Sequence, residues 1–289
     1  MTTTSTSPHD SRLALLLVTP ALVVIAGIAL VPIAATVWEA LHQHDLRLPW
    51  LGRPFIGAGN FIEALGDARF REAVAHTVAF SAISVPLELS LGLALAVLMH
   101  TVRRGRGLVR VAALLPWAIP TVVAALVWRL MFENVATAMR VDWFSDPLTA
   151  WIPIVVADVW KTTPFVAVLL LAGLQTIDPD VYDSARLDGA SPMRQFLTIT
   201  IPLLAPSLVV AAAFRTLDAL RIFDVPYVMT AGGPGTATEP LSMYAFAALM
   251  ERLRFGYGSA LSITLFALTF VVALASVRAL SRATPVEPS

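Results

Sequence analysis

Long apolar stretches, each interrupted by only a few polar residues, recur along the whole chain. A helix of about 20 apolar residues is long enough to cross a hydrocarbon core of about 30 Å. Proline inside such a stretch is tolerable, because neighbouring helices and waters satisfy the freed backbone groups. The pattern predicts six membrane-spanning helices, at Leu13–Leu41, Ala73–His100, Leu108–Phe132, Ala150–Leu174, Ile199–Ile222 and Ser259–Leu280.

Composition supports the same fold class, an all-α, polytopic membrane helical bundle with six transmembrane helices. Hydrophobic residues make up 57% of the chain and charged residues 14%, against about 25% charged residues in a soluble domain. The net charge of zero gives no field for nucleic acid, and the absence of cysteine excludes disulfides and thiol chemistry. We expect a disordered cytoplasmic N-terminus over 1–11, a transmembrane domain over 12–282 and a C-terminal tail over 283–289. The first apolar stretch, in which we expect breaks at Pro20, Gly27 and Pro32, is too long for a signal peptide.

Arginine placement predicts the orientation of the chain. The short connection after the second span carries arginines and no acidic residue: Arg103, Arg104, Arg106 and Arg110. Others follow the fourth span or end the sixth: Arg186, Arg194, Arg278 and Arg282. Cytoplasmic loops are enriched in Lys and Arg, so we expect these connections and both termini in the cytoplasm. Outer connections also carry Arg, but mixed with Asp and Glu. Binding of lipid headgroups is an alternative role for the first group.

A polar segment, residues 178–198, separates the fourth and fifth spans. Its residues predict two short helices: Asp178 or Asp180 caps the first near Pro179, Gly189 makes a break, and Ser191 with Pro192 begins the second. Apolar residues alternate with acids, so the segment can pack one side and present polar groups on the other; these are Val181, Ala185, Leu187 and Ala190. Such a short element cannot form a domain. It is either a solvated connection or a docking element for another protein.

Ionisable residues inside the spans are costly and are candidates for a functional site. Asp158 and Lys161 are three residues apart and therefore neighbours on one helix. The fifth span carries a row of alternating sign: Arg215, Asp218, Arg221 and Asp224. Equal numbers of cations and carboxylates favour a neutral ligand rich in hydroxyls, since both kinds of group form charge-assisted hydrogen bonds. The alternative is that these residues form ion pairs between helices, above all Arg215. For Glu39, Glu88 and Arg129 we favour snorkelling or helix packing.

The outer connection between the fifth and sixth spans contains Thr230-Ala231-Gly232-Gly233-Pro234-Gly235. Glycine and proline at this density predict a sharp reversal of the chain. No Lys followed by Ser or Thr comes after the glycines, so they do not form a P-loop. The histidines mostly flank spans and suggest no metal site. An intramembrane hydrolase is a weak alternative, because no Ser and His pair suggests a nucleophile and its base.

Two motifs carry a resemblance to a known family. Asp183-Ser184-Ala185-x-x-Asp188-Gly189-Ala190, followed by Phe196, Ile199 and Pro202, is similar to the EAA loop of ABC-importer permeases. Many members begin this loop with Glu-Ala-Ala, whereas this chain has Asp-Ser-Ala. The resemblance implies coupling helices within 178–198 that insert into a cleft of an ATPase subunit. It assigns that role to Tyr182, Asp183, Ser184, Ala185, Asp188, Gly189, Ala190 and Phe196.

The second motif is the outer loop Val228–Pro234 with Phe255–Ala260, which resembles the sugar-class permeases of the maltose and glycerol-3-phosphate group. Two further segments, Val159–Phe165 and Arg215–Asp224, look most like trehalose-importer permeases. In that group the spans on either side of the EAA loop line the translocation cavity. The substrate-binding residues that follow, from the resemblance together with the charge pattern, are Asp158, Lys161, Thr162, Phe165, Asp218, Arg221, Asp224 and Tyr227. Trp160 and Phe223 could add apolar faces against the sugar.

The resemblance implies a non-enzymatic permease subunit in the inner or plasma membrane, importing a neutral di- or oligosaccharide, with trehalose first and maltose-like sugars next. The implied partners are a second permease, a cytoplasmic ATPase pair and an external solute-binding protein. ATP and Mg²⁺ would be held by the ATPase, so no cofactor is expected on this chain. The alternative is an ion-coupled secondary transporter that uses the membrane carboxylates. The absence of an inverted sequence repeat disfavours it.

Overall fold

The computed structural model describes residues 8–102 and 104–283. The chain divides into two compact units: unit 1 comprises the chain up to Gly66 together with Ala247–Ile263, and unit 2 comprises Asp67–Phe246 and the chain from Thr264 onward. Within the described residues, six helices are long and apolar enough to cross a membrane, as predicted. They lie at Leu16–Ala40, Ala68–Thr101, Thr121–Ala138, Trp151–Leu174, Pro192–Ala219 and Phe255–Ser281.

Unit 1 contains the first long helix and several short helical elements. Its elements are α1 (Pro8–Ala40), η1 (Pro49–Leu51), α2 (Gly59–Gly66), η3 (Ala247–Glu251) and the beginning of α12 (Phe255–Ala283). The predicted breaks in the first span are wrong, because α1 continues through Pro20, Gly27 and Pro32. A proline inside a membrane helix removes one hydrogen bond without forcing the helix to end. The helix begins at Pro8, inside the stretch 1–11 expected to be disordered, and residues 1–7 lie outside the described residues.

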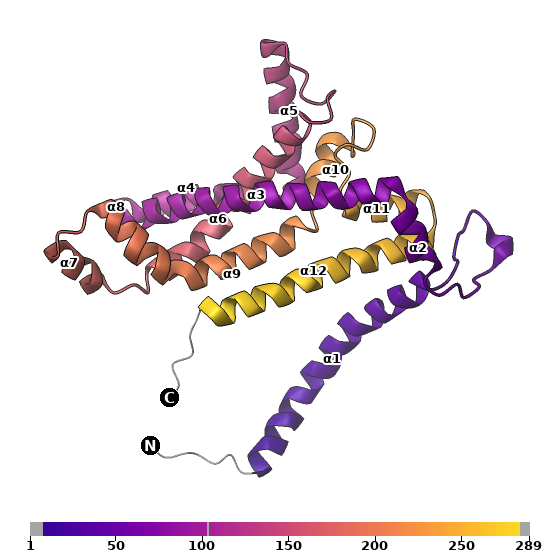
Figure 1. Ribbon diagram of the computed structural model, residues 1–289, viewed down its shortest axis with the longest axis horizontal. Helices are drawn as coiled ribbons and strands as arrows, with labels where there is room; N and C mark the ends of the chain where they lie inside the picture. The colour runs from indigo at the N-terminus through magenta and orange to yellow at the C-terminus, as the bar shows by residue number, and fades with distance from the viewer. Residues whose placement is uncertain (1–7, 103, 284–289) are drawn as a thin grey trace. The chain divides into compact units, whose positions relative to one another are not determined.

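Unit 2 is built on three long helices, α3 (Ala68–Thr101), α6 (Trp151–Leu174) and α9 (Ile201–Ala219), which contact one another. Figure 1 shows α3 running alongside α6 and α9, with α7 and α8 at one end and α10 and α11 towards the other. The remaining elements are α4 (Arg106–Ala118), α5 (Thr121–Met139), α7 (Pro179–Leu187), α8 (Pro192–Gln195), η2 (Phe196–Thr200), α10 (Asp224–Thr230), α11 (Leu241–Phe246) and the later part of α12.

The predicted third span is two helices rather than one. A proline disfavours helical backbone at the residue before it, and Ile119, which precedes Pro120, is extended with ψ of 133°. The chain therefore leaves α4 at Ala118 and enters α5 at Thr121. The carbonyl groups at the end of α4 are left without helical partners by this break.

Close packing of α3 on α6 forms the core of unit 2. A Cβ placed on Gly92 of α3 would come within 2.5 Å of Val166 of α6, so only glycine fits there. Small residues at helix interfaces let membrane helices approach closely. Two groups of buried residues fill the interfaces: one around Phe80, Ile154 and Met229, and the other around Met99, Leu170 and Leu204.

The connection between α9 and α12 reverses direction as its glycines predict. Ala231, Gly232 and Gly235 all adopt positive φ. The loop is tied to the long helices, since Trp151 Nε1 donates to Ala237 O at 2.8 Å. Two elements in this connection, α10 and α11, were not predicted from the sequence.

Candidate functional site

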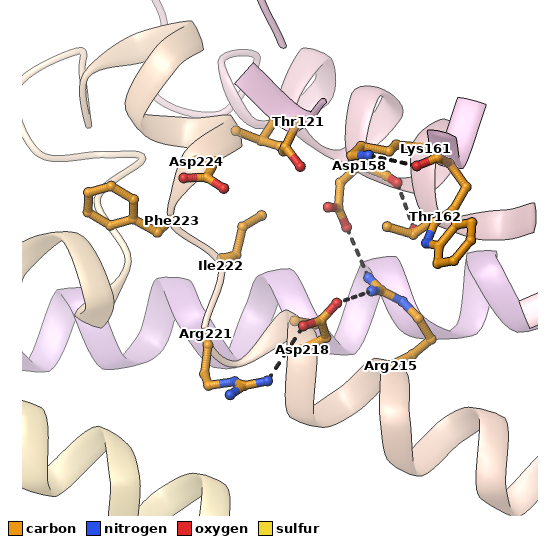
Figure 2. A pocket seen from close by; sticks show the side chains of 13 residues that line it. Thr121, Asp158, Lys161, Thr162, Arg215, Asp218, Arg221, Ile222, Phe223 and Asp224 are labelled. Carbon is orange, nitrogen blue, oxygen red and sulfur yellow. Dashed lines mark hydrogen bonds and ion pairs between the residues drawn. The ribbon is translucent and has the colours of Figure 1, made fainter. Parts of the chain in front are cut away.

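A cavity of about 290 Å³ lies in unit 2, walled by α4, α5, α6, α9 and α10. It is lined by Trp117, Thr121, Asp158, Lys161, Thr162, Arg215, Asp218, Ala219, Arg221, Ile222, Phe223, Asp224 and Val225. Figure 2 shows that polar side chains from residues before the polar segment in the sequence, and from residues after it, lie around this space. Ionisable groups that are far apart in the sequence therefore share one cavity.

The break after α9 creates one wall of the cavity. The row Arg215 to Asp224 was expected on one helix, but α9 ends at Ala219 and α10 begins at Asp224. Phe223 has φ of −139° and ψ of −58°, outside the helical region. The chain therefore turns within the row, and only its first two intervals keep neighbouring charges in contact. Arg215 lies 2.9 Å from Asp218, and Arg221 lies 3.6 Å from Asp218.

Arg215 is the buried centre of an ionic cluster, which we define as Glu88, Asp158, Arg215 and Asp218. Its Nε and Nη2 donate to the two carboxylate oxygens of Glu88 on α3, the second bond measuring 2.8 Å. Nη2 also donates to Asp158 Oδ2 at 3.2 Å, and Nη1 donates to Asp218 Oδ2 at 2.9 Å. Arg215 is only 3% exposed and Glu88 is completely buried. The cluster thus joins α3, α6 and α9 through one guanidinium group.

Lys161 does not pair with Asp158, although the two are three residues apart on α6. Its ammonium group donates to Ile119 O at 2.7 Å and lies 3.4 Å from Trp117 O. These are carbonyl groups left open by the break between α4 and α5, and a cation is favourable at a helix C-terminus. The ammonium has a third donor that these two contacts leave over.

Six of the eight residues predicted to bind substrate line the cavity: Asp158, Lys161, Thr162, Asp218, Arg221 and Asp224. Phe165 and Tyr227 do not line it. Phe165 stacks on Trp117 with 6.1 Å between ring centroids, and Tyr227 stacks on Phe223 at 5.1 Å. Both partner rings line the cavity, so each predicted aromatic supports a lining residue.

Glu88 is the residue of this site that the sequence did not assign to it. Helix packing, one of the two roles favoured for it, agrees with its position, whereas snorkelling does not. The sequence signal for Glu88 was a charged side chain in the middle of an apolar stretch. Its partner, Arg215, is 127 residues away in the sequence, so the spacing could not reveal the pair. Three cations and three carboxylates line the cavity, and Glu88 behind Arg215 adds a fourth carboxylate to the site. The formal charge of the site is therefore negative by one rather than balanced.

The polar segment folds as the two short helices predicted for it. Asp178 caps α7 by accepting from Asp180 N at 3.0 Å, and Ser191 caps α8 by accepting from Arg194 N at 3.4 Å. Gly189 makes the break with φ of +78°. Gln195 Nε2 donates to Ala190 O at 2.8 Å, which ties α8 back to the break.

Four apolar residues of the polar segment are exposed: Val181, Leu187, Met193 and Leu197. Leu187, at the end of α7, is 91% exposed, although its position among acids was expected to allow packing on one side. Of the residues predicted to couple to an ATPase, Tyr182 and Phe196 are half-buried, and Tyr182 Oη contacts Thr200 Oγ1 at 3.0 Å. The others, Asp183, Ser184, Ala185, Asp188, Gly189 and Ala190, lie on α7 or at the break, and Asp183, Ser184, Asp188 and Gly189 are exposed.

Neither site gathers metal ligands. Among the described residues, no group of three or more His, Asp or Glu side chains lies close enough to hold a metal ion. The chemistry available in the cavity is hydrogen bonding from carboxylates, hydroxyls and cations. The chemistry available on the polar segment is contact with another surface.

Comparison with known proteins identifies related chains. The family described as "Binding-protein-dependent transport system inner membrane component" matches residues 88–284. The trehalose/maltose transport system permease protein MalF of Thermococcus litoralis is 41% identical over 276 residues, covering 92% of this chain and 91% of that protein. The sulfoquinovosyl glycerol transport system permease protein SmoG of Agrobacterium fabrum is 39% identical over 273 residues, covering 91% and 88%. A chain of the crystal structure of a bacterial alginate ABC transporter, in complex with alginate pentasaccharide-bound periplasmic protein, has a TM-score of 0.79 at 20% identity, covering 97% and 98%.

Proposed function

This chain belongs to the family of binding-protein-dependent transport system inner membrane components, and from that premise we propose that it forms part of the pathway of an ATP-driven importer for neutral di- or oligosaccharides. Trehalose is the first candidate and maltose-like sugars follow. Relatives about 40% identical carry trehalose and maltose, or sulfoquinovosyl glycerol, in their names. The two kinds of substrate differ in charge, because the second carries a sulfonate. The charge of the cavity therefore decides between them.

The observation that carries the proposal is the set of carboxylates in the cavity. Asp158, Asp218 and Asp224 reach it from three different elements (Figure 2). The cations are largely engaged, since Arg215 is held by Glu88 and Lys161 by carbonyl groups. Carboxylates accept strong hydrogen bonds from hydroxyls and repel a sulfonate. A neutral polyol fits this arrangement better than an anion.

Each predicted residue has a role in this proposal. Asp158, Asp218 and Asp224 accept from sugar hydroxyls, and Arg221 and the third N–H of Lys161 donate to sugar oxygens. Thr162, whose hydroxyl donates to Asp158 O, can accept from a sugar hydroxyl. Phe223, backed by Tyr227, offers an aromatic face to the apolar side of a sugar ring, as Trp117 does with Phe165 behind it.

The polar segment is proposed to dock on a cytoplasmic ATPase. It is short, it is tied together by its own caps, and it exposes Leu187 at its tip. An exposed apolar side chain on a rigid polar element suits insertion into a cleft of a partner. The segment leads through η2 directly into α9, which carries Arg215 and Asp218. Movement of the docked segment would therefore be transmitted to a wall of the cavity.

The complete transporter proposed here contains a second permease subunit, an ATPase pair that binds ATP and Mg²⁺, and an external solute-binding protein. Both termini and the polar segment lie on the cytoplasmic side, as the arginine distribution favours. The ATPase states favour different openings of the cavity. The sugar shifts this equilibrium only as far as it binds the two openings differently. An ion-coupled mechanism is not favoured by the family to which the chain belongs.

Reconstitution tests the proposal. The chain is co-expressed with a candidate second permease, ATPase and solute-binding protein, and the complex is placed in proteoliposomes. Uptake of labelled trehalose should require internal ATP and the binding protein, and should persist when an uncoupler is added. Uptake that collapses with the uncoupler and continues without ATP would establish the ion-coupled alternative. Failure to transport any neutral sugar, with transport of a sulfonated one, would refute the assignment of substrate class.

A further inference from the structure

Glu88 occupies an unusual place for a residue that does not reach the cavity. It is completely buried in the middle of α3, a helix that contributes no residue to the cavity lining. Its carboxylate is engaged by two donors of Arg215, Nε and Nη2. Placing an ionised carboxylate inside a membrane protein is expensive. A packing role alone could be filled by an apolar residue of similar size.

The geometry of Arg215 indicates what Glu88 contributes. A guanidinium has five N–H donors in a planar fork, and one edge of this fork, Nε with Nη2, is bound to Glu88. The donors that remain on Nη2 and Nη1 reach Asp158 at 3.2 Å and Asp218 at 2.9 Å. Glu88 therefore holds the fork in one plane, and in that plane the other donors hold two cavity carboxylates.

We propose that Glu88 is a positioning residue that makes the cavity select neutral sugars over anionic ones. By binding the rear edge of Arg215, it neutralises that cation and turns the guanidinium so that carboxylates, rather than an unsatisfied cation, border the cavity. The inference rests on the proposed function, because it takes the cavity to be the sugar site.

Charge counting gives the direction of the effect. With Glu88 present, three cations face four carboxylates, and the site is negative by one. With Glu88 replaced by Gln the charges balance, and Arg215 has a donor edge without an anion. An anionic ligand can then supply the missing charge. Removing both charges in a Glu88→Gln, Arg215→Gln double variant leaves two cations and three carboxylates, so the site is again negative by one.

The test uses the purified importer complex in lipid nanodiscs, without binding protein, so that only the membrane cavity selects. Labelled trehalose is displaced by unlabelled trehalose or by sulfoquinovosyl glycerol, and the ratio of the two competition constants is measured. For Glu88→Gln we expect this ratio to shift towards the anion by about tenfold or more. A factor of ten corresponds to ~1.4 kcal/mol, and the interaction between two unit charges at close range in a medium of intermediate dielectric exceeds that energy. The double variant should return the ratio towards that of the wild type. Glu133→Gln, which removes an exposed carboxylate on α5 outside the cavity, should leave it unchanged.

A role in packing alone would lower the binding of both ligands together and would not move the ratio. A correctly assembled Glu88→Gln complex with the ratio of the wild type therefore overturns the inference. If that variant does not assemble, Glu88→Asp decides. Its carboxylate keeps the charge but is one methylene shorter, which weakens its contacts with Nε and Nη2 of Arg215 and frees the guanidinium to turn towards an anion. The ratio should therefore shift in the same direction by a smaller amount, and an unchanged ratio again overturns the inference. Wild-type complex that binds sulfoquinovosyl glycerol in preference to trehalose would instead refute the proposed function.

Discussion

The ionic cluster and the polar segment differ in how their side chains match their surroundings. The cluster places charges inside an apolar bundle, and there each charge is met by an opposite one: Arg215 is 3% exposed and is bound on two edges. The polar segment carries exposed apolar side chains, of which Leu187 is the most exposed at 91%. A buried charge without a partner is costly, whereas an exposed leucine in water loses only the gain that burial would bring.

The difference separates two kinds of function within one subunit. Groups that are satisfied internally can hold the shape of a cavity whether or not a ligand is present. An exposed apolar side chain such as Leu187 is stabilised when a partner protein buries it. The cluster is therefore expected to control folding and selectivity, and the polar segment to control association. Variants in the two regions should fail in different measurements.

The largest effect is expected from Arg215→Ala. This change leaves Glu88 and Asp158 buried without their cation, and breaking a buried ionic network by removing one partner costs about 3–5 kcal/mol. The purified complex should unfold at markedly lower temperature, and less of it should assemble. Arg129→Ala is the matched control, because Arg129 is 45% exposed in its pair with Glu133 and exposed pairs contribute about 1 kcal/mol or less. Equal losses from the two changes would remove the distinction between buried and exposed ion pairs in this protein.

Leu187→Glu should give the next largest effect, and in a different measurement. Thermal unfolding should change by no more than about 0.5 kcal/mol, as is usual for exposed positions. ATP-driven uptake should fall by about tenfold or more, because burying a leucine in a partner contributes about 1.5–3 kcal/mol. Leu187→Met keeps an apolar side chain of similar size and should retain most uptake. Uptake at the level of the wild type in Leu187→Glu complexes would show that the tip is not buried by the ATPase.

The spans, the caps and the glycine break were predictable because each depends on residues that are close together in the sequence. The six apolar stretches, the caps at Asp178 and Ser191 and the break at Gly189 all follow from residue types acting on their immediate neighbours. The continuous α1 was missed because the surroundings of a membrane proline decide whether a helix ends. The break before Pro120 was missed for the same reason. The end of α9 at Ala219 was missed because no proline or glycine stands there to indicate it.

Most of the ionisable residues that line the cavity could be predicted, but the ion pairs and hydrogen bonds between them could not. Six of the eight predicted residues line it, since charges inside apolar spans are rare enough to identify the site. Their partners did not follow from spacing along one helix. Lys161 binds carbonyl groups at a break that was not foreseen, and Arg215 binds Glu88, which lies on another helix. Contacts between helices depend on packing, and no local pattern in one chain encodes them.

A smaller effect is expected from Gly189→Val. At φ of +78° a residue with a Cβ is strained by about 1–2 kcal/mol, although nothing lies within 4 Å of the added atom. The strain should change the direction of α8 relative to α7 and reduce uptake several-fold while ATP hydrolysis continues. Gly189→Asn should be milder, because Asn tolerates this conformation better. Gly107→Ala on α4, where the added atom meets nothing and φ is not in the left-handed range, should have no effect, and a similar loss there would point to general instability.

The smallest effect, and the sharpest test of the cavity, is expected from Asp218→Asn. The Asp218 side chain is 64% exposed although it contacts Arg215 and Arg221, so its replacement leaves no buried charge uncompensated. Asn keeps one acceptor but forms weaker hydrogen bonds than a carboxylate, which lowers the affinity for a sugar by about 1 kcal/mol, or roughly fivefold. Trehalose uptake by the reconstituted complex should show a raised KM with normal assembly and normal thermal unfolding. Asp142→Asn, after α5 and outside the cavity, should change none of these quantities. An Asp218→Asn complex that assembles poorly but keeps the KM of the wild type would assign Asp218 to the ion-pair network alone and leave Asp158 and Asp224 as the carboxylates that meet the sugar.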